Sequence, residues 1–197
     1  MRGQLLLDDA DVRREATVQE VVLKCGAVRL VPFSRSDLSL VQDLHCDVSV
    51  DRYSSPDPAA RSAEDVERFL AETEKSRDSY GFSRWKALSA EGRFLGWAGF
   101  SAFEETSEIE LSYCFTEAAL NKDPGLPCRM CQALVDWFFD NTYFSHLVAM
   151  VRTDNKAARD SLLKTGFAYR ESRRIAGFPC DVFQMLSPAM QSYVMSA

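Results

Sequence analysis

The chain has 197 residues, enough for one domain with a sizeable buried core. Hydrophobic residues make up 46% and charged residues 26%, which is the composition of an ordinary soluble globular protein. The formal net charge is −6 and no block of like charge stands out, so we expect no nucleic-acid partner. An acidic protein of this kind suits a cationic small molecule or a basic peptide.

Neither a membrane segment nor a secretory signal is expected from the sequence. No apolar run approaches the roughly 20 residues that a membrane helix needs. The start of the chain has only three consecutive leucines, Leu5 to Leu7, before two acids. We therefore expect a cytoplasmic protein without a membrane partner.

Patterning and turn residues predict a tail over residues 1–17 and a single domain over residues 18–197. The predicted strands are Val18–Leu23, Val28–Phe33, Phe82–Ser89, Arg93–Phe103, Glu108–Phe115, His146–Arg152, Phe167–Arg173 and Asp181–Leu186. Helices are predicted over Leu38–Leu44, from the capping box Ser62–Asp65 to about Arg77, after Pro127, and over Asn155–Lys164. This order fits the α/β (α+β) class, with a mixed sheet and helices on both faces.

The segment Val148–Phe167 is the most informative part of the chain. A short buried strand is followed by a helix that Asp154 or Asn155 caps, and Gly166 stands where a helix end favours a left-handed residue. These helix signals alone also fit an ordinary capped amphipathic helix between two strands. The spacing is more specific, with the residues Asn155, Ala158, Lys164, Gly166 and Phe167.

This spacing resembles the last motif of the GCN5-related N-acetyltransferases (GNAT), in particular the ribosomal-protein N-acetyltransferase (RimJ/RimL-like) branch. The resemblance covers about Val28 to Leu186 and implies a mostly antiparallel central sheet. It also implies acetyl-CoA as co-substrate, no metal, and a primary amine as acceptor. The acceptor is either a protein N-terminus or a small molecule, and the protein is either a monomer or a homodimer.

The resemblance places the pyrophosphate of the cofactor at a helix start, where backbone N–H groups bind anions. The family pattern there is Gln/Arg-x-x-Gly-x-Gly/Ala, and the matching segment is Lys122–Pro127. Pro127 removes one N–H donor, and Asp123 adds a negative charge beside the pyrophosphate. The expected cofactor-binding residues are Cys114, Phe115, Lys122, Gly125, Leu126, Pro127, Cys128, Asn155 and Lys164.

The strand Glu108–Phe115 resembles the branch's Glu-Ile-Gly-Tyr-Trp-Leu, and the resemblance implies that a bulge splays it. Alternation places Glu108, Glu110 and Ser112 on one face of the sheet. Glu110 is the expected general base, because the acceptor ammonium must lose a proton before it attacks a thioester. The family's Tyr seven residues after the Asn is Leu162 here, so Tyr113 is the candidate proton donor, with Tyr169, water or an unaided thiolate as alternatives.

The resemblance assigns acceptor selection to the first helices, where Asp47–Tyr53 resembles the branch's Asp-x-x-Val-x-Arg-Tyr. Tyr53, Trp85 and Trp97 are the expected acceptor-binding residues, and each is equally compatible with a place in the core. The altered phosphate loop keeps a second reading open, a catalytically weak or inactive GNAT fold that binds a CoA ligand or a protein partner.

The pair Cys128 and Cys131 supports a third reading. A zinc site needs two more ligands, and neither His45 nor His146 follows a finger pattern. A redox sensor remains open, because a thiol near a helix start is favoured as thiolate. The alternative is two structural thiols one turn apart on a helix.

Overall fold

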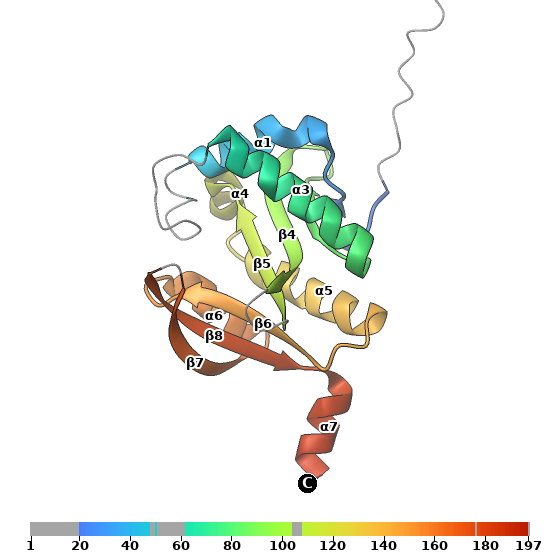
Figure 1. The fold of residues 1–197 in the computed structure, drawn as a ribbon, viewed down its shortest axis with the longest axis vertical. Coiled ribbons are helices and arrows are strands. Elements are labelled where there is room, and N and C mark those ends of the chain that lie inside the picture. The colour runs from blue at the N-terminus through green and yellow to red at the C-terminus, as the bar shows by residue number, and fades with distance from the viewer. Residues whose placement is uncertain (1–19, 48–49, 51–61, 104–107, 176, 197) are drawn as a thin grey trace, which may run out of the picture.

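The computed structural model describes residues 20–47, 50, 62–103, 108–175 and 177–196 (Figure 1). Both the predicted tail 1–17 and Tyr53 lie outside the described residues. Eight strands form one sheet in the order β1-β2-β3-β4-β5-β6-β8-β7. The strands are β1 (Leu23–Cys25), β2 (Val28–Val31), β3 (Arg84–Leu88), β4 (Phe94–Phe103), β5 (Glu108–Phe115), β6 (His146–Arg152), β7 (Ala168–Ile175) and β8 (Phe178–Leu186).

The described helices lie before, between and after these strands in the chain. They are the short 3-10 helix η1 (Arg35–Asp37), α1 (Leu38–Cys46), α3 (Ala63–Tyr80), α4 (Glu117–Lys122), α5 (Leu126–Asn141), α6 (Lys156–Lys164) and α7 (Pro188–Ser196). None of these helices is both long enough and apolar enough to cross a membrane.

The predicted α/β class with helices on both faces of a mostly antiparallel sheet is confirmed. Helices α1 and α3 cover one face, where Val41 and Phe69 pack with Trp97 of β4. Helix α5 covers the other face, where Met130 and Phe138 belong to the larger core cluster. Leu162 of α6 belongs to that cluster too, so α5 and α6 lie on the same face. The two helical layers are visible in Figure 1.

The sheet is split in its middle. All neighbouring strands pair antiparallel except β5 and β6, which run parallel and share the single register pair Glu110 and Val148. The predicted bulge does not occur in the β4–β5 pairing, which is continuous over all eight residues of β5. The expected splaying lies on the other side of β5, where the strand separates from β6.

Local signals explain where several elements begin and end. Ser62 Oγ accepts a hydrogen bond from the Asp65 N–H at 3.2 Å, and the Asp65 carboxylate accepts one from the Ser62 N–H at 3.0 Å. This predicted capping box starts α3, and Gly81, with φ of 77°, ends it after Tyr80. Asn155, rather than Asp154, caps α6, and Gly166 has a φ of 95° as predicted.

Some elements differ from the predictions. Residues 20–22, the described part of the predicted strand before Leu23, are not in a strand, and β1 is Leu23–Cys25, because the tight turn is made by Gly26 and Ala27 alone and Cys25 pairs with Val28. Helix α4 was not predicted; it begins at Thr116, whose hydroxyl accepts from the Ala119 N–H at 3.2 Å. Helix α7 was not predicted either, and it buries none of its residues.

Candidate active site

Glu110 lies at the point where β5 and β6 part. It is half-buried, and its side chain lies on the α3 face of the sheet, the same face as Cys114. Ile109 and Leu111 point to the other face and belong to the larger core cluster. Burial raises the pKa of the Glu110 carboxyl from 4.5 to about 7. The charge of Arg84 and a hydrogen bond from the Met150 N–H of β6 oppose that rise. A carboxylate titrating near neutrality suits a general base.

Arg84 of β3 is the residue near Glu110 that the sequence did not reveal. Its Nη2 donates a hydrogen bond of 2.8 Å to Ser101 Oγ, and Ser101 pairs in register with Glu110. Its Cζ lies 5.3 Å from the ring centroid of Phe69 and 5.5 Å from that of Trp97. These contacts hold a guanidinium next to the candidate base. The only signal in the sequence is a charged residue alternating with the buried Trp85 in a strand.

A cleft of about 790 Å³ lies over Glu110 and Arg84. One wall is a face of α3 that carries Glu72, Lys75 and Ser79, while Ser101 belongs to the floor. This cleft gives an acceptor access to the Glu110 carboxylate.

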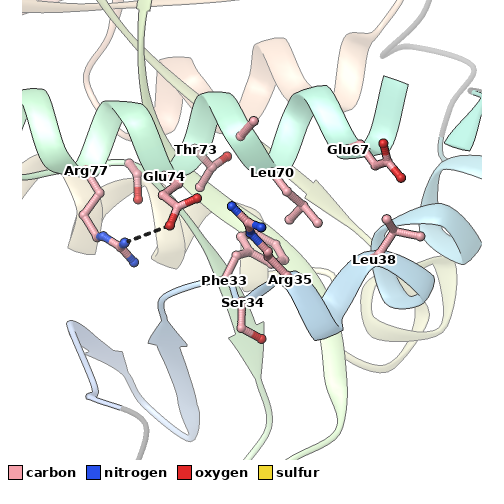
Figure 2. Close-up of a pocket in the computed structure, with 11 residues that line it drawn as sticks. Phe33, Ser34, Arg35, Leu38, Glu67, Leu70, Thr73, Glu74 and Arg77 are labelled. Carbon is pink, nitrogen blue, oxygen red and sulfur yellow. Dashed lines mark ion pairs between the residues drawn. The ribbon is translucent and has the colours of Figure 1, made fainter. Parts of the chain in front are cut away.

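A second groove, of about 450 Å³, lies along a different face of α3 (Figure 2). It runs between α3, with Leu70 and Glu74, and the segment that carries Phe33 and Arg35. Neither Glu110 nor Arg84 lines it. The cleft over Glu110 is therefore the candidate acceptor site.

Tyr113 projects from the opposite face of β5 to Glu110, so the structure does not bring the two candidate catalytic side chains together on one face. Its ring stacks on Phe115 at 5.5 Å and its hydroxyl is hydrogen-bonded with Ser161 of α6. Burial and the neighbouring thiols of Cys131 and Cys128 raise the pKa of Tyr113, while Ser161 lowers it. The phenol is therefore protonated at neutral pH and carries a proton that it could transfer.

The phosphate-loop candidate forms the start of α5. Gly125 precedes its first residue, and a Cβ added there would lie 2.7 Å from Arg129 Nη1. The Leu126 N–H bonds to the Asp123 carbonyl. Among the described residues, the N–H groups of Gly125 and Cys128 have no such partner, so two donors remain beside Pro127. These donors fit an anionic phosphate.

Asp123 in this loop is neutralised by an ion pair with Arg129, a residue that the sequence reading missed. Lys122 is exposed and lies near Glu91 of the β3–β4 turn. The loop therefore repels an anion less than its sequence indicates, because the Asp123 carboxylate already has a counterion.

Two further cofactor candidates lie at the two ends of α6. Asn155 Oδ1 accepts from the Ala158 N–H at 3.1 Å, which leaves the side-chain NH2 group to donate elsewhere. At the other end, Thr165 Oγ1 lies 3.8 Å from Cys128 Sγ, so the last turn of α6, with the exposed Lys164, lies beside the start of α5.

The remaining candidates have buried side chains. Cys114 packs in the cluster below α1 and α3, and Phe115 packs in the larger core, so in each case only the backbone is left for the cofactor. Trp85 contacts Trp137 of α5 at 5.0 Å, whereas Trp97 packs on Phe69 of α3 at 5.4 Å. The two tryptophans lie on opposite faces of the sheet, and the structure does not bring them together.

Of the two cysteines Cys128 and Cys131, the second has little thiolate character. Cys131 is buried, and burial together with Cys128 raises the pKa of its thiol to about 12. All six cysteines are free thiols. Within the described part of the chain, no three His, Cys, Asp or Glu side chains gather as a metal site.

Solved structures share this fold. RimL, a ribosomal L7/L12 alpha-N-protein acetyltransferase in complex with coenzyme A, has a TM-score of 0.70 at 14% identity, covering 86% of this chain and 99% of its own. Spermidine N-acetyltransferase from Vibrio cholerae, in complex with CoA and spermine, has a TM-score of 0.66 at 15% identity, with coverage of 82% and 96%. A GNAT-family acetyltransferase from Bacillus anthracis has a TM-score of 0.68 at 15% identity, with coverage of 84% and 98%.

No curated protein matches the chain significantly in sequence. The sequence model of the acetyltransferase (GNAT) domain, however, matches residues 27–168, and the chain therefore belongs to this family. It is an acetyl-CoA-dependent N-acetyltransferase.

Proposed function

We propose that the protein acetylates a primary amine, carried by a small molecule or a protein N-terminus, and that it belongs to the RimJ/RimL-like branch. Residues 18–197 act as one catalytic domain in this proposal. The observation that carries it is the position of Glu110, a half-buried carboxylate with a pKa of about 7 at the split between β5 and β6, facing a cleft.

Glu110 takes a proton from the acceptor ammonium, and the neutral amine then attacks the thioester carbonyl. The new C–N bond forms as the C–S bond breaks, and the departing thiolate takes up a proton. Tyr113, protonated and hydrogen-bonded with Ser161, is the proposed donor on the opposite face of β5. Substrates held at the split between β5 and β6 would have the base on one side and the phenol on the other.

The start of α5 binds the pyrophosphate in this proposal, through the N–H groups of Gly125 and Cys128. Lys122, Lys164 and the exposed edge of Arg129 add positive charge near it. The NH2 group of Asn155 donates to the extended arm of the cofactor.

The first test is calorimetric binding of acetyl-CoA, with Gly125→Trp as a variant that fills the loop. We expect micromolar binding that the variant abolishes, and Glu110→Gln should keep that binding while lowering kcat by about 100-fold or more. No binding at millimolar acetyl-CoA would refute the enzyme proposal and favour a non-catalytic binding module, the reading that Pro127 and the buried Leu162 motivate.

A further inference from the structure

Two opposite charges lie side by side on the floor of the cleft. Glu110 comes from β5 and Arg84 from β3, and Ser101 of the intervening strand holds the guanidinium through its 2.8 Å hydrogen bond. Because the guanidinium also lies over the rings of Phe69 and Trp97, its position is set by the sheet and α3 before any acceptor binds.

The described residues that line the cleft include as many bases as acids. Among the described residues, two acids, Glu72 and Glu110, face two bases, Lys75 and Arg84. A polyamine carries only positive charge, so an ammonium bound near Glu110 would bring its neighbours toward Arg84. Like charges at close range in a partly buried site are unfavourable.

A second guanidinium lies near the same cleft. Arg173 of β7 has its Cζ 5.2 Å from the ring centroid of Phe103, which lines the cleft. Its Nε and Nη2 atoms are buried without a hydrogen-bond partner in the described part of the chain, and Glu171 Oε1 is 3.9 Å from Nη2. Buried donors of this kind normally have a hydrogen-bond partner, so a ligand oxygen near Phe103 would complete the hydrogen bonding of Arg173.

We propose that the acceptor is an α-amino acid, with its carboxylate bound by Arg84 and its amine delivered to Glu110. An α-amino acid carries its positive and negative groups on one carbon atom, which complements the adjacent charges of Glu110 and Arg84. A planar guanidinium matches a carboxylate with two parallel hydrogen bonds. Arg84 takes no part in the bond changes, in which the amine loses a proton to Glu110 and gains the acetyl group; it determines specificity.

This inference rests on the proposed function, and binding tests it without turnover. Calorimetry in the presence of CoA would compare each standard α-amino acid with the amine that remains when its carboxylate is removed. We expect at least one amino acid to bind roughly 10- to 100-fold more tightly than its paired amine. The inference is overturned if every amino acid binds no more tightly than its paired amine. It is also overturned if spermidine or a peptide N-terminus binds more tightly than the amino acids.

Variants assign the preference to Arg84. Arg84→Met should reduce the discrimination to less than about threefold, and Arg84→Lys should restore part of it. Arg68→Met, the same change at an exposed position of α3, serves as the matched control and should retain the full discrimination. Unchanged CoA binding by each variant shows that it is folded. If Arg84→Met discriminates as the wild type does, Arg84 does not bind the carboxylate.

The two proposals fail in different ways. An amino acid that binds through Arg84 without being acetylated supports the binding role of Arg84 but contradicts the proposed function. Acetylation of amines that lack a carboxylate, at the same kcat/KM as their amino acids, supports the proposed function and contradicts the acceptor assignment.

Discussion

Lys86 Nζ lies 2.7 Å from one carboxylate oxygen of Asp37 and 2.8 Å from the other, and both side chains are almost completely buried. The Ser34 N–H also donates to this carboxylate, at 2.8 Å. The ion pair joins η1, which leads into α1, to β3 two residues after Arg84. It therefore ties the segment that leads into α1, which packs against α3, to the strand that carries Arg84.

Removing one partner of this pair should cost much stability. Lys86→Met leaves the Asp37 carboxylate buried without its cation, and we expect a loss of about 3–5 kcal/mol in the free energy of unfolding. Urea denaturation measures it. The exposed pair of Arg93 and Glu91 is the control, since Arg93→Met should cost less than about 1 kcal/mol. A loss below 1 kcal/mol for Lys86→Met would show that water reaches Asp37.

Glu110 should make the protein less stable as the pH rises. Its pKa is raised in the folded state to about 7 from an ordinary value of 4.5, so between these values the folded state holds a proton that the unfolded state has released. Stability from this group is therefore present below pH 4.5 and is lost as the pH rises through 7, by roughly 3 kcal/mol.

Glu110→Gln removes this dependence. Denaturation measures the free energy of unfolding at pH 5 and pH 8. The value for the variant, relative to that of the wild type, should be higher at pH 8 than at pH 5. Arg84→Met, which removes a charge that lowers the pKa, should extend the loss of stability to higher pH. A wild-type-to-variant difference that is identical at the two pH values would contradict the buried environment of Glu110.

The charges of the phosphate loop should have opposite effects on cofactor affinity. Asp123→Asn removes a negative charge and releases Arg129, so CoA should bind about two- to fivefold more tightly. Arg129→Met leaves Asp123 without its counterion and should weaken binding by a similar factor. Calorimetry at low salt measures both, with Arg68→Met as the control that removes the same charge as Arg129→Met. Weaker binding by Asp123→Asn would show instead that the ion pair shapes the loop.

Cys131 should be the inert member of the cysteine pair. At pH 8 its thiol, with a pKa of about 12, carries almost no thiolate, whereas Cys46 is exposed. Iodoacetamide followed by peptide mass mapping should label Cys46 first and Cys131 only after unfolding. Labelling of Cys131 in the folded protein at the rate of Cys46 would revive the redox reading.

Local signals made part of this structure predictable. The capping box at Ser62, the left-handed Gly166 and the alternation that separates Glu110 from Leu111 each depend on residues close in sequence, and each prediction is confirmed. The parallel run of β5 and β6 depends instead on a long connection through α4 and α5, and periodicity does not encode it.

For the same reason, the sequence could not predict that Arg84 and Glu110 lie together on the floor of the cleft. Arg84 meets Ser101 only through the β3–β4 pairing, and Ser101 meets Glu110 only through the β4–β5 pairing. Trp85 and Trp97 illustrate the problem further: Trp85 pairs with Ala98 and Trp97 with Lys86, an offset that sends the two rings to opposite faces. The hairpin register had to be known before either residue could be placed.

The single register pair between β5 and β6 leaves two strand edges facing each other inside a continuous sheet. Edges of this kind usually invite another chain to add a strand. An extended ligand that seats between them would act as a ninth, non-covalent strand and would raise stability in proportion to the logarithm of its concentration. If acetyl-CoA is that ligand, the free energy of unfolding of this protein would depend on how much acetyl-CoA is present.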